Sequence, residues 1–192
     1  MRILGIDPGL TRCGVGVIDV GPDRRLTLVH VEVIQTAPAT ELPLRLLAIR
    51  QALSGAFDAF SPDRVALERV FAQQNLRSVM GTAQVSGLLL AEAAGRDIAV
   101  DLHTPTEVKA AVSGSGRANK VQVAAMVRRL LNMDDSALLP DATDALALAI
   151  CNAWRGGSGA GGGTAAKSTN LTPAQQRWRD AESLARRNRG SN

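Results

Sequence analysis

The sequence predicts an α/β protein in which helices cover both faces of a mixed five-stranded sheet. Three strand-like segments come first, and helical and strand-like segments then alternate, an order typical of a mixed sheet with helices on its faces. With 192 residues, 45% of them hydrophobic, the chain is long enough for one well-packed core but too short for two large domains.

The first three strands are expected at residues 2–6, 13–20 and 26–34, which together form a β-meander. The first strand ends at Asp7, because the following Pro8 lacks the backbone donor that a continuing strand needs. A carboxylate is therefore expected at a strand end.

The later elements alternate between helix and strand. In residues 41–60, apolar side chains recur at spacings of three and four, which predicts an amphipathic helix. A compact apolar strand at residues 65–67 then leads directly into Glu68, a second carboxylate at a strand end. The remaining predictions are a helix at 75–94, a fifth strand at 98–102, a short helix at 106–112, a flexible loop at 113–116, a helix at 120–131 and a final helix at 141–154.

The C-terminal residues differ in composition from the rest of the chain. Residues 156–163 are all Gly, Ser or Ala, which is typical of a flexible linker. Residues 155–192 carry seven Lys and Arg against two acidic residues, whereas residues 1–154 carry 15 basic and 16 acidic ones. We expect one folded domain over 1–154 and a linker with a basic, disordered tail over 155–192. Any nucleic-acid site in the domain must then be a local patch.

The sequence favours a cytoplasmic protein. No apolar stretch approaches the roughly 18 residues that a membrane-spanning helix needs, and Asp7 interrupts the only apolar run near the N-terminus. Cys13 and Cys151 lie in apolar segments and belong to no Cys-x-x-Cys pair, so neither a disulfide nor a zinc site is expected.

Four acidic residues occupy positions that suit a shared site, namely Asp7, Glu68, Asp141 and Asp144, called below the four acids. Asp141 and Asp144 are three apart in the first turn of a helix, so both side chains point to one side. Each acid also has a simpler explanation. Acids in the first turn interact favourably with the helix dipole, by about 0.3–1 kcal/mol each. Asp7 can cap a turn, and Glu68 can pair with a neighbouring arginine.

The four acids together favour metal-dependent phosphodiester chemistry. Converging carboxylates repel one another, and a folded protein tolerates them mainly when a cation neutralises the cluster. Hard oxygen ligands favour Mg²⁺ or Mn²⁺, and two such ions can activate water and stabilise a leaving oxygen. Neither histidine offers a better site, because His30 and His103 both lie in predicted strands, where a lone histidine is more often structural.

Four motifs carry a resemblance to a known family. They are Ile6-Asp7-Pro8-Gly9-Leu10-Thr11-Arg12-Cys13-Gly14, Glu68-Arg69-Val70-Phe71, Gly81-Thr82-Ala83-Gln84 and Asp141-Ala142-Thr143-Asp144-Ala145-Leu146-Ala147. In their order and spacing they resemble the RuvC family of Holliday-junction resolvases over about residues 1–154, with the tail departing from the family pattern. The first motif alone also resembles the phosphate loop of actin-like ATPases, but this chain has no room for their second lobe.

The resemblance implies a ribonuclease-H-like fold and a crossover junction endodeoxyribonuclease. The four acids would hold two Mg²⁺ ions per subunit, with Mn²⁺ as a substitute. A homodimer would resolve four-way junction DNA in recombination and repair, by paired symmetric nicks that leave ligatable 5′-phosphate and 3′-hydroxyl ends. The RuvA and RuvB branch-migration proteins would be its partners. A catalytically silent junction-binding protein of the same fold is the main alternative.

Further residues acquire roles only through the resemblance. Lys109 and Lys120 match lysines near the scissile phosphate, although lysines on helices are more often simply solvated. Phe71 matches an aromatic residue that stacks on a base, and packing beneath its loop explains it equally well. Arg117 is a candidate phosphate contact. The helix at 75–94, which contains two glycines, is a candidate dimer interface, or its glycines serve packing within one subunit.

Overall fold

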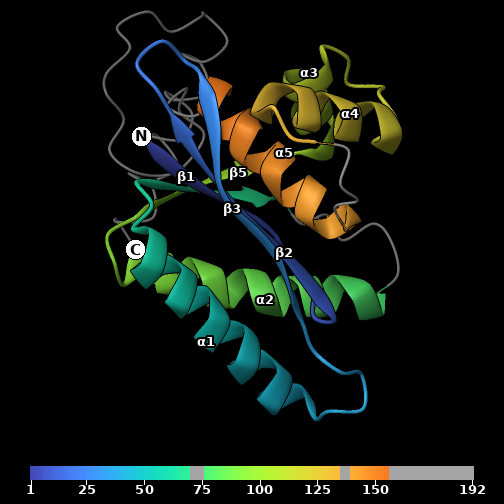
Figure 1. Ribbon diagram of the computed structural model, residues 1–192. Helices are drawn as coiled ribbons and strands as arrows, with labels where there is room; N and C mark the ends of the chain where they lie inside the picture. The colour runs from blue at the N-terminus through green and yellow to red at the C-terminus, as the bar shows by residue number, and fades with distance from the viewer. Residues whose placement is uncertain (70–75, 135–138, 156–192) are drawn as a thin grey trace, which may run out of the picture. The chain divides into compact units, whose positions relative to one another are not determined.

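A computed structural model describes residues 1–69, 76–134 and 139–155, with the side chains of 76–78 left out. It contains a five-stranded sheet in the order β3-β2-β1-β4-β5 (Figure 1). The strands β1 and β2 pair antiparallel, as do β2 and β3, whereas β1 pairs parallel with β4 and β4 with β5. The strand bounds are β1 Arg2–Asp7, β2 Arg12–Val20, β3 Leu26–Gln35, β4 Arg64–Glu68 and β5 Ala99–His103. The predicted mixed sheet is confirmed.

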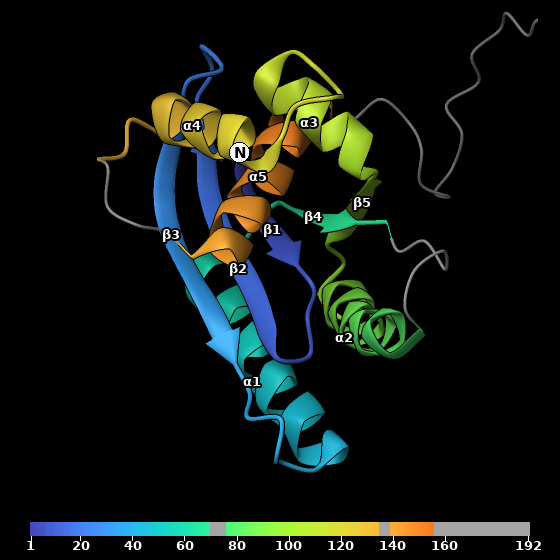
Figure 2. The same cartoon turned by 90° about the vertical axis from the view of Figure 1, so that its right-hand side faces the viewer.

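Helices cover both faces of the sheet, as predicted (Figures 1 and 2). One face carries α1 (Leu42–Phe60) and α2 (Leu76–Ala94) over a core that includes Leu4, Ile6 and Leu53. The other face carries α3 (Pro105–Ser113), α4 (Lys120–Leu131) and α5 (Pro140–Arg155) over a second core. Every predicted strand and helix is present, with ends that differ by no more than one residue. No helix in the described residues is long and apolar enough to cross a membrane.

Three glycines bring the backbone of α5 onto the sheet. A Cβ at Gly5 would lie 2.1 Å from the carbonyl oxygen of Ala145, and a Cβ at Gly14 would lie 2.0 Å from that of Asp141. A Cβ at Gly16 would lie 2.8 Å from the side chain of Leu146. Only glycine permits this approach, since a real Cβ does not come so close to another heavy atom. The first turn of α5 is thereby held against β1 and β2.

The two lysines singled out by the sequence lie on helices whose starts are fixed by capping boxes. Thr104 caps α3, and its hydroxyl accepts a hydrogen bond from the backbone N–H of Glu107, whose side-chain carboxylate in turn accepts one from the backbone N–H of Thr104. Asn119 and Gln122 form the same arrangement at the start of α4. Because α3 begins directly after β5, its cap fixes where this helix leaves the carboxyl edge of the sheet, and the second cap fixes where α4 begins at Lys120.

Substituting Gly5 tests the close approach of α5 to the sheet. We expect Gly5→Ala to lower the free energy of unfolding by about 1–3 kcal/mol, since the added methyl forces α5 away from β1. Gly55 on α1 is the matched control, because a Cβ there meets nothing within 4 Å. Gly55→Ala should stabilise the protein by about 0.5–1 kcal/mol. Urea unfolding measures both changes, and equal effects at the two positions would contradict the packing described here.

Candidate active site

Two of the four acids lie side by side on parallel strands. Ile6 of β1 pairs with Leu67 of β4, and Asp7 and Glu68 each follow one residue later. The carboxyl ends of adjacent parallel strands meet at one edge of the sheet, so sequence positions 61 residues apart become neighbours there. Both side chains are partly buried at this edge.

The other two acids come from the first turn of α5. The contact between Gly14 and the backbone of Asp141 places this turn beside the end of β1, because Gly14 pairs with Asp7. Asp144 lies one helical turn further along α5, and its side chain is also partly buried. The structure therefore brings the four predicted acids to one edge of the sheet.

The pKa values show that these carboxylates interact. The pKa of Asp7 is raised to about 7, first by burial and then by the nearby negative charges of Asp144, Glu68 and Asp141, in that order of importance. Burial also raises the pKa of Glu68, with a second contribution from the charge of Asp144. Each ionised carboxylate at the site therefore makes it harder for the next carboxyl group to lose its proton. A bound cation would relieve this repulsion.

Two basic side chains already contact acids of the site. The Nζ of Lys120 donates a hydrogen bond of 3.0 Å to Oδ2 of Asp144, and this contact raises the pKa of Lys120. The Nε of Arg12 lies 2.9 Å from Oδ2 of Asp141. Among the described residues, no three His, Cys, Asp or Glu side chains stand ready as a group to hold a metal ion. Holding one would require side-chain rotation at this edge.

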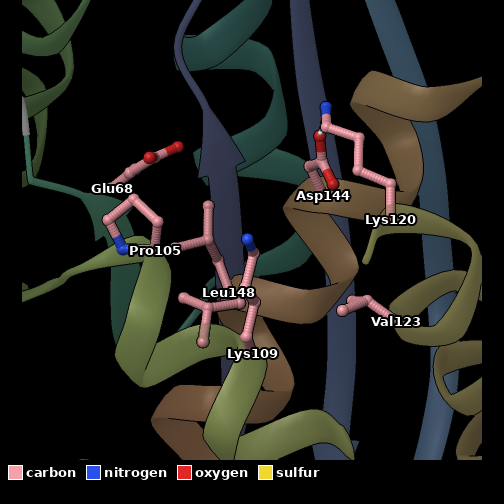
Figure 3. A pocket seen from close by; sticks show the side chains of 8 residues that line it. Glu68, Pro105, Lys109, Lys120, Val123, Asp144 and Leu148 are labelled. Carbon is pink, nitrogen blue, oxygen red and sulfur yellow. Dashed lines mark hydrogen bonds and ion pairs between the residues drawn. The ribbon is translucent and has the colours of Figure 1, made fainter. Parts of the chain in front are cut away.

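A pocket of about 230 Å³ opens between Glu68 and Asp144 (Figure 3). Figure 3 shows Lys120 lying against Asp144 on one side, with Glu68 on the other and Lys109 between and below them in this view. The rest of the wall is apolar and consists of Pro105, Val108, Val123 and Leu148. Carboxylates and ammonium groups thus line one small hollow with an apolar floor.

Arg117 and Phe71 are the other predicted site residues. Arg117 does not line this pocket but a separate groove, together with Ser115, Gln122 and Met126. Phe71 lies outside the described residues. His103 is 7% exposed and burial lowers its pKa, which agrees with the structural role expected of a strand histidine.

Arg12 is a residue at this site that the sequence analysis did not single out. It belongs to the first motif, and it precedes Gly14 by two residues on β2. Since side chains alternate along a strand, Arg12 faces α5 as Gly14 does. This alternation predicts that Arg12 and Gly14 lie on the same face of the sheet. It points to the acidic site only once α5 is known to pack on that face.

Comparison with known protein sequences agrees with the family that the four motifs resemble. The family model described as crossover junction endodeoxyribonuclease RuvC matches residues 3–152. The protein of that name from Leifsonia xyli is 55% identical over 95% of this chain and 92% of its own length. That from Paenarthrobacter aurescens is 53% identical over 98% of this chain and 99% of its own length. These alignments extend beyond residue 154, where we expected the resemblance to end.

Solved structures agree with the fold. The Thermus thermophilus RuvC structure is 31% identical, with a TM-score of 0.74 over 81% of this chain and 95% of that one. A second structure, of T. thermophilus RuvC in complex with Holliday junction substrate, is 32% identical with a TM-score of 0.75 and covers 80% of this chain and 93% of that one. The yeast mitochondrial resolvase Ydc2 shares the fold at 14% identity and a TM-score of 0.56, over 79% of this chain and 78% of that one. With its motifs, ribonuclease-H-like sheet and acidic edge, this chain belongs to the RuvC family of crossover junction endodeoxyribonucleases.

Proposed function

We propose that this chain resolves four-way DNA junctions by paired symmetric nicks, leaving 5′-phosphate and 3′-hydroxyl ends that can be ligated. The observation that carries the proposal is the gathering of the four acids at one sheet edge, where their charges and their burial together raise the pKa of Asp7 to about 7. A protein that only bound junctions would gain nothing from this electrostatic strain. The membership of the RuvC family supplies the substrate class.

The four acids are the proposed ligands of Mg²⁺, with two ions per subunit and Mn²⁺ as a substitute. Carboxylates fit these ions by their hardness, and the divalent charge offsets the repulsion that raises the pKa values of Asp7 and Glu68. Ions held by these residues would activate a water and stabilise the leaving oxygen. The ends of β1 and β4 and the first turn of α5 bring the carboxylates to one edge of the sheet, where rotation of the side chains would let them share an ion.

Basic and aromatic residues around the acids are the proposed DNA contacts. Lys109 and Lys120 line the pocket with Glu68, so their ammonium groups are suited to attract a phosphate and to stabilise charge that develops during cleavage. Arg117, in a separate groove, is a proposed contact to a more distant phosphate. Phe71 is proposed to stack on a base of the opened junction.

A homodimer is required for paired nicks, and α2 is its proposed interface. The exposed side of this helix carries Met80, Ala83, Gly87, Leu90 and Ala94, a stripe of small and apolar residues at spacings of three and four. Met80 is 58% exposed and Leu90 41%, so a second copy would bury apolar surface here. Gly81, by contrast, packs against Leu10 of its own subunit.

The localisation, the protein partners, the role of the C-terminal residues and the bounds of the nuclease domain are also proposals. The protein acts in the cytoplasm and works with the RuvA and RuvB branch-migration proteins. Residues 155–192 add salt-sensitive DNA affinity or are a passive tail, and the nuclease domain corresponds to residues 1–154.

Loss of Asp7 should abolish cleavage without abolishing binding. We expect Asp7→Asn to cut a synthetic four-way junction more than roughly 100-fold more slowly than the wild type does. Losing a residue that only supports a metal ligand costs up to about 100-fold, and losing a ligand itself should cost more. Its affinity for the junction should stay close to that of the wild type, because the substitution removes a single negative charge and no positive charge that attracts the DNA phosphates. Gel assays of cleavage in Mg²⁺ and of binding in EDTA measure the two effects.

Asp97→Asn is the matched control for this substitution. Asp97 is exposed and has a φ of 56°, a backbone conformation that asparagine also tolerates. It should cleave at the wild-type rate. Cleavage by the wild type in EDTA would refute the metal mechanism, and preference for duplex or RNA–DNA hybrid over the junction would refute the proposed substrate.

The stability of the metal-free protein should fall as the pH rises from about 4 to about 7. The folded pKa of Asp7 is raised from 3.8 to about 7, so in this range the folded state keeps a proton that the unfolded chain releases. Asp7→Asn lacks this titration and should therefore exceed the wild type in melting temperature above pH 7, in EDTA. The difference should vanish near pH 4. Equal pH profiles of the two proteins would show that Asp7 lies in no strained environment.

Enlarging Gly87 should disrupt the dimer. A Cβ at Gly87 would meet nothing within 4 Å in its own subunit, so we expect Gly87→Leu to keep the fold and to obstruct only a partner. Gly55→Leu on α1 has the same freedom and is the control. Light scattering after gel filtration should give a dimer for the wild type and Gly55→Leu, and a monomer for Gly87→Leu. A dimeric Gly87→Leu would place the interface elsewhere.

A further inference from the structure

Arg12 contacts the acidic site from a strand that carries none of the four acids. It is the first residue of β2, and its side chain faces α5 because it lies two residues before Gly14. Its Nε lies 2.9 Å from Oδ2 of Asp141. The Arg12 side chain is 60% exposed while that of Asp141 is 22% exposed, so the arginine reaches inward from solvent.

Arg12 and Asp141 form an ion pair but no hydrogen bond. Although the two atoms are close, the N–H does not point along a hydrogen bond, and the buried Oδ2 of Asp141 has no hydrogen-bond donor among the described residues. An arginine that recognises a carboxylate for stability usually donates two parallel hydrogen bonds. Lys120, by comparison, donates a proper hydrogen bond to Asp144. Arg12 therefore neutralises charge without satisfying the oxygen.

A divalent cation is a better partner for that oxygen than Arg12 is. A buried acceptor without a donor is costly, and a metal–oxygen bond removes that cost together with the repulsion among the acids. The exposed arginine loses little on release, because water solvates its guanidinium and exposed ion pairs contribute little. The geometry thus favours exchange of one cation for the other.

We propose that Arg12 is a displaceable counter-cation, which neutralises Asp141 in the metal-free enzyme and has to leave it before a divalent ion binds there. Arg12 is thus a positioning residue, and it sets the concentration of divalent ion at which the site around Asp141 becomes occupied. The proposal rests on the metal-dependent function proposed above.

Titration with Mn²⁺ alone tests this competition. Isothermal calorimetry without DNA should show that Arg12→Gln binds Mn²⁺ about two- to fivefold more tightly than the wild type, the range expected for losing an exposed ion pair. Arg12→Lys, which keeps the charge, should lie between them. Arg50→Gln is the matched control, because Arg50 is 59% exposed and lies 3.6 Å from Glu92, away from the four acids. It should bind Mn²⁺ as the wild type does.

Thermal unfolding supplies a readout independent of metal affinity. In EDTA at pH 8, Arg12→Gln should melt below the wild type, because Asp141 has lost the only ion pair that it forms among the described residues. Saturating Mn²⁺ should close this gap. Equal or weaker Mn²⁺ binding by Arg12→Gln would overturn the proposal while leaving the nuclease function standing. Failure of the wild type to bind Mn²⁺ would overturn the metal-dependent function itself.

Discussion

The close approach of α5 to β1 and β2 is the constraint on which the site depends. Gly5, Gly14 and Gly16 let the helix backbone rest directly on the sheet, and a Cβ at any of them would collide with α5. This contact decides that the first turn of α5, with Asp141 and Asp144, lies at the end of β1. The Arg12–Asp141 ion pair and the apolar contacts of α5 with the sheet add to this attachment. A packing feature of the core thus determines where the acids of α5 lie relative to the strand ends.

Charge is the second constraint, and it opposes the first. Packing gathers and buries these carboxylates, and the raised pKa values of Asp7 and Glu68 reflect first this burial and then the repulsion between neighbouring charges. Lys120 and Arg12 relieve part of this repulsion by contacting one acid each. These contacts leave the carboxylates only partly neutralised. That state fits the proposed binding of a divalent ion and of a polyanionic substrate in one small region.

The two faces of the sheet have different tasks. The face under α5 carries the acids, the pocket and the two lysines, and its helices α3 and α4 start at firm capping boxes. The opposite face carries α2, whose exposed apolar stripe is the proposed contact between subunits. The proposed cleavage site and the proposed subunit contact thus lie on separate surfaces.

The sequence by itself determined the element order, the mixed sheet and the identity of the four acids, because these depend on local periodicity, on turn residues and on motifs. It also determined that Asp7 and Glu68 end strands, since each follows an apolar run. Only the tertiary structure decided that Arg12 contacts Asp141, that Arg117 lies in a different groove from Lys109, and that Gly81 packs internally while Gly87 faces outward. Such contacts join residues distant in the chain through the packing of a helix on a sheet. No local pattern encodes them, because the pattern of one segment does not state which other segment will cover it.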